Sequence, residues 1–230
     1  TADAEIYDVS PELVLVDTGV IASADPRYLS AGMGDALATW YEARACARNS
    51  TAVYVFGGRP TLAGTAIAEL CAETIYENGE EALEDARHSR VSVPLDKVVE
   101  ANTLLSGLGY ESGGLATCHA ISQGYTVVED IHRNYLHGEM VAMGVLAQLM
   151  LEGEDKEAER AVCFFSRMGL PVQLGDSRMS ELDTSKLEAI VDSAMAFPYL
   201  DNMPFPVSEK ALMAAILAAH ELGKQLSNLK

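Results

Sequence analysis

The stretch Thr61 to Asn78, TLAGTAIAELCAETIYEN, decides the fold class of this 230-residue chain. Its apolar residues recur every three or four positions, the spacing that places them on one face of an α-helix. We expect this helix to begin just after Pro60 and to stop at Asn78 and Gly79, since both residue types favour helix ends. The same periodicity continues from about Ser30 to the end of the chain, and it predicts a mainly α fold.

Prolines, glycines and serines mark the ends of further helices. We expect one helix over 80–87, a second from Pro94 to Leu105, a third that ends at Met168, and a fourth from Ser208 towards Leu226. The third of them is followed by Gly169, which favours a left-handed helix cap.

The first twenty residues differ in kind from the rest. Glu5 to Tyr7 and Leu13 to Asp17 are β-prone runs on either side of a turn-forming segment, which predicts a hairpin or a pair of neighbouring strands. Leu13 to Val16 are apolar without alternation, as in strands covered on both faces. No later segment offers such a sheet. We therefore divide the chain into a strand-like remnant, 1–22, and an all-α domain, 23–230, and interpret it as part of something larger.

Composition excludes several classes of protein. Sixteen Lys and Arg against 34 Asp and Glu give a formal net charge of −18, which argues against nucleic acid and anionic membranes as partners. The sequence shows no secretory leader and no apolar run long enough to span a bilayer. The four cysteines lie far apart, so free thiols and a cytoplasmic location are the simplest interpretation.

Glycine clusters do not indicate a nucleotide site. Gly57 and Gly58 precede a helix but lack the GxGxxG pattern, and the cluster around Gly107 and Gly109 has Ser112 at the third position. We interpret these glycines as helix junctions and expect no cofactor-binding residue in this chain.

Two of the five histidines stand out. His88 and His132 lie among polar residues, and His220 is explained by a favourable position near the end of the last helix. His119 and His137 differ, because small or glycine-rich neighbours would let a ligand approach their rings.

Asp35 has a comparable setting, since it follows Gly32 and Gly34 and precedes an apolar helix. One carboxylate oxygen and two imidazole nitrogens can hold a divalent ion at three corners and leave a position open, as in catalytic sites. Spacing alone, however, does not select Asp35, His119 and His137 from the other Asp and His residues. The residues by themselves support only a hypothesis of a metal site.

Seven segments resemble, in order and spacing, the C-terminal domain of the glycerol dehydrogenase family. This family is the metal-dependent polyol branch of the superfamily that includes iron-containing alcohol dehydrogenases and dehydroquinate synthase. The segments are LVLVDTGVIA (13–22), AGMGDALATWYEA (31–43), GGRPTLAGTAIAELC (57–71), GGLATCHAISQG (113–124), LHGEMVAMGVLAQL (136–149), GLPVQLGD (169–176) and PFPVSEKAL (204–212).

The resemblance implies the helical-bundle C-terminal domain of that fold, with the N-terminal strands left over from an absent α/β domain. It places the metal ligands on Asp35, His119 and His137, and puts His119 beside the glycerol. Iron-type relatives carry a further His where this chain has Thr39, which favours the three-ligand zinc pattern. Dehydroquinate synthase-like members have Glu at the position of Asp35, so the dehydrogenase interpretation is preferred.

The resemblance further implies NAD-dependent oxidation of glycerol, or a similar vicinal diol, to a ketone such as dihydroxyacetone, with the metal lowering the pKa of the substrate hydroxyl. The NAD-binding domain of the family is missing from this sequence. We therefore expect the chain to bind Zn²⁺, or another divalent ion in its place, but not NAD, and to catalyse no hydride transfer alone. The alternative is a non-catalytic helical module that retains the ligands and forms a homo-oligomer, through its N-terminal strands.

Overall fold

The structure is a computed structural model that describes residues 9, 11–53, 57–177, 179–180 and 183–227. Within these residues all regular structure is helical and no β-strand occurs, which confirms the predicted mainly α fold. The α-helices are α1 (Thr18–Ser23), α2 (Pro26–Ala47), α3 (Leu62–Arg87), α4 (Val93–Glu100), α5 (Ser106–Gly113), α6 (Thr117–Tyr125), α7 (Glu129–Asn134), α8 (His137–Glu152), α9 (Asp155–Met168), α10 (Thr184–Met195) and α11 (Glu209–Ser227). A π-helical turn, η1 (Ala101–Leu105), joins α4 to α5, and two 3₁₀ turns are η2 (Leu174–Ser177) and η3 (Leu200–Asn202).

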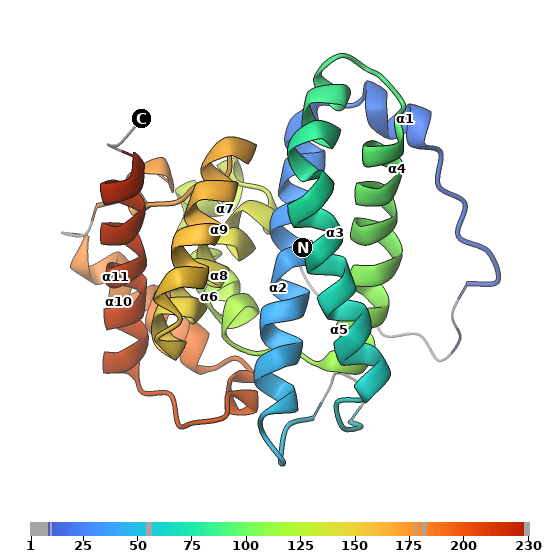
Figure 1. Cartoon of the computed structure of the whole chain (residues 1–230). Coiled ribbons are helices and arrows are strands. Elements are labelled where there is room, and N and C mark those ends of the chain that lie inside the picture. The colour runs from blue at the N-terminus through green and yellow to red at the C-terminus, as the bar shows by residue number, and fades with distance from the viewer. Residues whose placement is uncertain (1–8, 10, 54–56, 178, 181–182, 228–230) are drawn as a thin grey trace.

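Helix α2 lies between two groups of helices (Figure 1). On one side it packs against α3 and α5, and on the other against α8, which in turn packs against α6 and α11. The side chains of Met33, Leu37 and Tyr41 on α2 are almost completely buried. The long helices α2 and α8 therefore set the positions of the helices around them.

Side chains at the helix starts explain where several helices begin. Asp25 accepts a hydrogen bond from the backbone N–H of Arg27 at the start of α2, where Pro26 is the first residue. Thr61 and Ser92 accept from backbone N–H groups in the first turns of α3 and α4. Such caps satisfy N–H groups that have no partner within the helix, and proline fits the first position because it has no N–H.

The predicted helix end at Asn78 and Gly79 is wrong, because α3 runs unbroken to Arg87 and includes the expected acidic helix 80–87. The Asn78 side chain donates to the carbonyl of Thr74, one turn earlier in the same helix. A Cβ on Gly79 would lie 2.8 Å from the Phe164 ring. Gly79 therefore serves the close packing of α3 and not its termination.

Other predicted helix boundaries are confirmed. Pro94 lies in the first turn of α4, and the helical path continues through η1 to Leu105 and beyond. Helix α9 ends at Met168 with Gly169 in the left-handed conformation, at φ 74°. Helix α11 begins directly after Ser208, whose hydroxyl accepts from the N–H of Ala211.

The predicted strand pair is not formed in the described residues. Glu5 to Tyr7 lie outside them, and Leu13 to Asp17 pair with no other strand because the described part of the chain provides none. Leu13 and Leu15 are 76% and 86% exposed, whereas Val16 is partly buried against the core, so only the first part of this apolar run is uncovered. Helix α1 spans the predicted boundary between residues 22 and 23, and the division into 1–22 and 23–230 stays a prediction.

All four cysteines are free thiols, three of them buried, as the sequence indicated. Among the described helices, none combines the length and the apolar character that crossing a membrane requires.

Candidate metal centre

Three helices bring Asp35, His119 and His137 together. Asp35 lies in the third turn of α2, His119 in the first turn of α6, and His137 is the first residue of α8. One oxygen of Asp35 lies 3.4 Å from Nε2 of His119 and 3.6 Å from Nε2 of His137. The three ligand atoms all lie within 4.8 Å of one another. Residues from three parts of the sequence thus form one donor cluster.

The spacing of these atoms fits a divalent ion. Zinc binds carboxylate oxygen and imidazole nitrogen at about 2.0–2.2 Å, and two ligands of a tetrahedral ion are then about 3.3–3.6 Å apart. The two distances from Asp35 match this range. Three protein ligands leave a fourth corner for water or substrate, as in catalytic zinc sites.

Glycines at two helix crossings allow the helices that carry the cluster to approach so closely. A Cβ on Gly138, next to His137, would lie 1.9 Å from the carbonyl oxygen of Ala31 on α2. A Cβ on Gly144, further along α8, would lie 2.2 Å from the carbonyl oxygen of Cys118 on α6. Because α8 touches the backbones of both partner helices, the ligand positions depend on these two glycines.

A carboxylate that the sequence analysis missed lies behind the cluster. Glu42 is two turns after Asp35 on α2, and it is fully buried. One of its oxygens accepts from Nδ1 of His119 at 2.6 Å, on the side of the ring opposite Asp35. A charged residue within a helix usually faces solvent, so the sequence held no local signal for Glu42.

Charges on neighbouring groups shift the pKa values in the cluster. Burial alone would lower the pKa of His119, but the carboxylates of Glu42 and Asp35 on its two sides raise it to about 10. Burial would raise the pKa of Asp35, but its interactions with His119 and His137 outweigh burial and lower it. Burial together with the charge of His119 lowers the pKa of His137 despite the nearby Asp35. Asp35 is thus kept ionised, and the His137 ring is neutral more readily than usual, as metal binding requires, whereas His119 holds its proton more tightly and must release it when an ion binds.

The start of α8 is fixed by a second buried acid. Glu139 accepts from the backbone N–H of Leu136 and from the guanidinium of Arg27, at 2.6–2.7 Å. These bonds tie the first turn of α8, and with it His137, to the first turn of α2.

Thr39, at the position where iron-type relatives carry a histidine, takes no part in the cluster. Its hydroxyl forms a hydrogen bond of 2.9 Å with the hydroxyl of Ser106 at the start of α5. The described donors are thus the three predicted ones.

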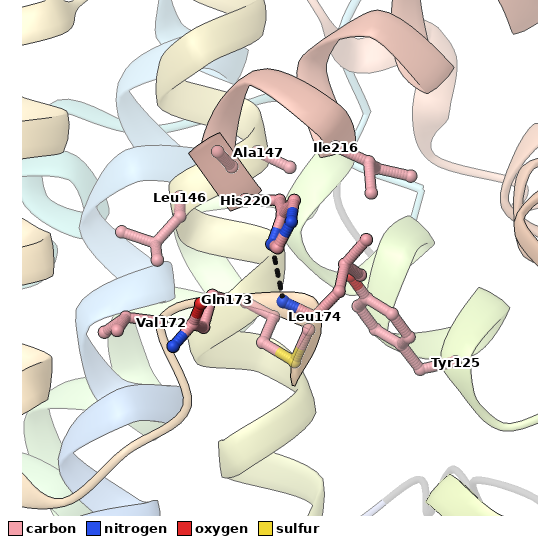
Figure 2. A pocket seen from close by; sticks show the side chains of 10 residues that line it. Tyr125, Leu146, Ala147, Val172, Gln173, Leu174, Ile216 and His220 are labelled. Atoms are coloured by element: carbon pink, nitrogen blue, oxygen red, sulfur yellow. Dashed lines mark hydrogen bonds between the residues drawn. The ribbon is translucent and has the colours of Figure 1, made fainter. Parts of the chain in front are cut away.

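The remaining histidines lie elsewhere, and one was explained wrongly. His88 and His132 are exposed, in agreement with the sequence interpretation, although His132 lies in helix α7. His220 is only 5% exposed, and Figure 2 shows its ring directed at the loop after α9. Its Nδ1 accepts from the backbone N–H of Leu174 at 3.2 Å, beside a cavity of about 10 Å³. His220 therefore supports a buried loop and is not placed there by the helix dipole.

The cluster is open on one side. The side chains of His137 and Asp35 are 53% and 39% exposed, whereas that of His119 is 19% exposed. Two of the three side chains are therefore accessible to solvent.

Comparison with known proteins places this chain in a structural class. No family model matches the chain. The crystal structure of an iron-containing alcohol dehydrogenase from Thermococcus thioreducens has a TM-score of 0.63 at 17% identity, over 89% of this chain and 53% of that one. The helical arrangement is therefore that of the iron-type alcohol dehydrogenase fold.

Closer relatives narrow the class. Glycerol dehydrogenase of Citrobacter freundii is 43% identical over 222 residues, which are 96% of this chain and 60% of that protein. Glycolaldehyde reductase of Halobacterium salinarum is 41% identical over the same shares. The crystal structure of glycerol dehydrogenase from Schizosaccharomyces pombe has a TM-score of 0.88 at 32% identity, over 98% of this chain and 58% of that one. The chain therefore belongs to the glycerol dehydrogenase family, which is a family of oxidoreductases.

The chain spans about 60% of the length of the curated relatives it matches. This share agrees with the prediction that the sequence corresponds to one part of a longer enzyme.

Proposed function

We propose that this chain provides the metal-binding half of an NAD-dependent glycerol dehydrogenase, with Asp35, His119 and His137 as the metal ligands. The observation that carries the proposal is the convergence of these three side chains, in which an Asp35 oxygen lies 3.4 and 3.6 Å from the two histidine nitrogens, distances that suit ligands of one divalent ion. Their agreement with the ligands implied by the family supports Zn²⁺ as that ion.

A divalent ion held there would act as a Lewis acid and lower the pKa of a substrate hydroxyl. The chain's own residues have simpler roles. Asp35 supplies negative charge to the site, and the imidazoles bind as neutral donors, His119 after release of its Nε2 proton. His119, the least exposed of the three, also borders the substrate in this proposal, so that its ring orients a vicinal diol such as glycerol.

Hydride transfer also needs NAD to be held against the substrate. Holding two reactants in place contributes on the order of 7 kcal/mol or more of barrier reduction. The glycine clusters of this chain do not form a dinucleotide-binding pattern, and we assign NAD binding to the part of the enzyme outside this sequence. We therefore expect no turnover of glycerol by this chain alone.

The partners and location follow from the same proposal. Glycerol and related diols are the substrates, while the charge of −18 disfavours nucleic acid and anionic membrane surfaces. The free cysteines support a cytoplasmic location.

A second proposal concerns assembly. The exposure of Leu13, Val14 and Leu15 favours a homo-oligomer in which this run pairs with another copy. Light scattering before and after deletion of residues 1–18 tests this, and an unchanged mass would reject it.

The metal proposal is tested by isothermal titration of the chelator-stripped chain with zinc and then with NAD. We expect one zinc site, its loss in His119→Ala, and no heat from NAD. His88→Ala is the matched control, because it removes an exposed histidine at the end of α3 that is distant in sequence from all three ligands. Absence of zinc binding, or equal affinity in wild type and His119→Ala, would reject the proposed site.

A further inference from the structure

The Glu42 carboxylate accepts three hydrogen bonds from a single place, the start of α6. One oxygen accepts from the backbone N–H groups of Ala116 and His119, at 2.8 and 2.9 Å. The other accepts from Nδ1 of the His119 ring at 2.6 Å. Glu42 thus holds both the backbone and the side chain of one residue of the cluster.

This arrangement determines which nitrogen of His119 faces the cluster. A carboxylate can only accept hydrogen bonds, so Nδ1 must carry a proton in this contact. The nitrogen left to donate a lone pair is Nε2, which lies 3.4 Å from the Asp35 oxygen. A metal-binding histidine commonly gives its other N–H to a carboxylate, which fixes the tautomer and strengthens the ligand.

The burial of Glu42 shows that this contact is built into the fold. A buried carboxylate is costly unless its oxygens are well hydrogen bonded. Here the three donors lie at the N-terminus of a helix, where the helix dipole also favours negative charge. The side chain is fully inaccessible and can neither turn away nor be replaced by water without a large change.

We propose that Glu42 is a positioning residue, which keeps the proton of His119 on Nδ1 and thereby presents Nε2 to the metal. This inference rests on the proposed metal site. The competing interpretation is purely structural, with Glu42 serving only to attach the start of α6 to α2.

Glu42→Gln separates the two interpretations. The amide keeps one acceptor oxygen, which can still serve the two backbone N–H groups of α6. Its NH₂ group then faces Nδ1 as a donor, which favours a proton on Nε2 and blocks that nitrogen. We expect zinc affinity to fall 10- to 100-fold, the range for loss of such a partner.

The matched control is Gln148→Met. Gln148 is fully buried and accepts from the backbone N–H of Cys118 at 3.0 Å, in the same first turn of α6, and from the Cys118 thiol. Its NH₂ group donates to the carbonyl of Tyr41 and to the carboxylate of Glu152, and the residue makes no hydrogen bond to the His119 ring. A variant that loses these bonds, and loosens the turn without touching the ring, should leave zinc affinity within about threefold of wild type.

The second readout needs no metal. In ¹⁵N-histidine-labelled, metal-free protein we expect a downfield Nδ1–H proton from His119, assigned by its absence in His119→Ala. That signal should disappear in Glu42→Gln and persist in Gln148→Met. If Glu42→Gln fails to fold by circular dichroism, Glu42→Asp replaces it, because it retains the charge but withdraws the oxygens from the ring.

The outcomes are distinguishable. Weaker zinc binding together with loss of the Nδ1–H signal supports the proposal. Unchanged zinc affinity in the folded Glu42 variant, or an unchanged signal, overturns it while leaving the metal site intact. A wild-type chain that binds no zinc overturns the proposed function and this inference together.

Discussion

Replacing Gly138 with alanine should open the metal cluster without touching a ligand. The new Cβ would lie 1.9 Å from the carbonyl oxygen of Ala31, a distance that real Cβ atoms avoid below about 3.0 Å. Because the obstacle is backbone within α2, no side-chain rotation relieves it. Helices α2 and α8 must therefore separate by about 1.1 Å or distort locally.

The size of the effect on the cluster follows from this shift. If the helix separation of about 1.1 Å acts along the line between Asp35 and His137, the distance between their ligand atoms grows from 3.6 Å to about 4.7 Å. Two ligands bonded to one zinc ion at about 2.0–2.1 Å cannot be more than about 4.2 Å apart. One of the two bonds is then lost, and overpacking of this kind costs about 1–3 kcal/mol of folding free energy.

The assays are zinc titration and urea unfolding of the metal-free chain, each with Gly107→Ala as control. Gly107 is an exposed position in α5, and a Cβ there would meet nothing within 4 Å. The same chemical change should therefore stabilise the chain by about 0.5–1 kcal/mol and leave zinc affinity unchanged. If Gly138→Ala matched Gly107→Ala in both assays, the reasoning from helix contact to metal geometry would be refuted.

Three further predictions concern pH, capping and metal removal. The His119 pKa is about 10 in the folded chain and about 6.5 in the unfolded chain, so the folded metal-free chain binds more protons between these values. Its unfolding free energy should therefore fall as pH rises from 6.5 to 10, and an unfolding free energy from urea titrations that rises across this range would contradict the prediction. Ser92→Ala should cost about 1 kcal/mol in urea unfolding by removing the α4 cap, whereas Ser92→Thr should retain most of it. Chelation of zinc present at 100 times its Kd should lower the unfolding free energy by about 2.7 kcal/mol, and Asp35→Asn should abolish this difference.

Much of the fold could be predicted from the sequence because helix ends carry local chemistry. Gly169 and Ser208 act within one turn of their own position, so the sequence indicated the ends they mark. Gly79 does not end a helix, because its neighbour is Phe164, on a helix far away in the sequence. A glycine that ends a helix and a glycine that lets two helices touch look alike until the packing is known.

The residues of the candidate site also divide into those that could be predicted from the sequence and those that could not. Asp35, His119 and His137 come from distant segments, and only the resemblance to a family selected them from the other acidic and histidine residues. Glu42 could not be found, since its role depends on the start of α6 meeting the middle of α2. His220 was explained wrongly for the same reason, as its partner is a loop that precedes it by many residues.

The π-helical turn η1 sets the rotational phase of α5. Such a turn holds one residue more than an α-helical turn, and a single residue rotates a helix by about 100°. With η1 present, Ser106 faces Thr39, and Gly109 fits where a Cβ would lie 2.7 Å from the Thr39 methyl group. Deleting one residue from Ala101–Leu105 would bring Tyr110 to that place, against α2 and one turn from Asp35. The length of this linker is therefore as much a constraint on the chain as the identity of any residue in it.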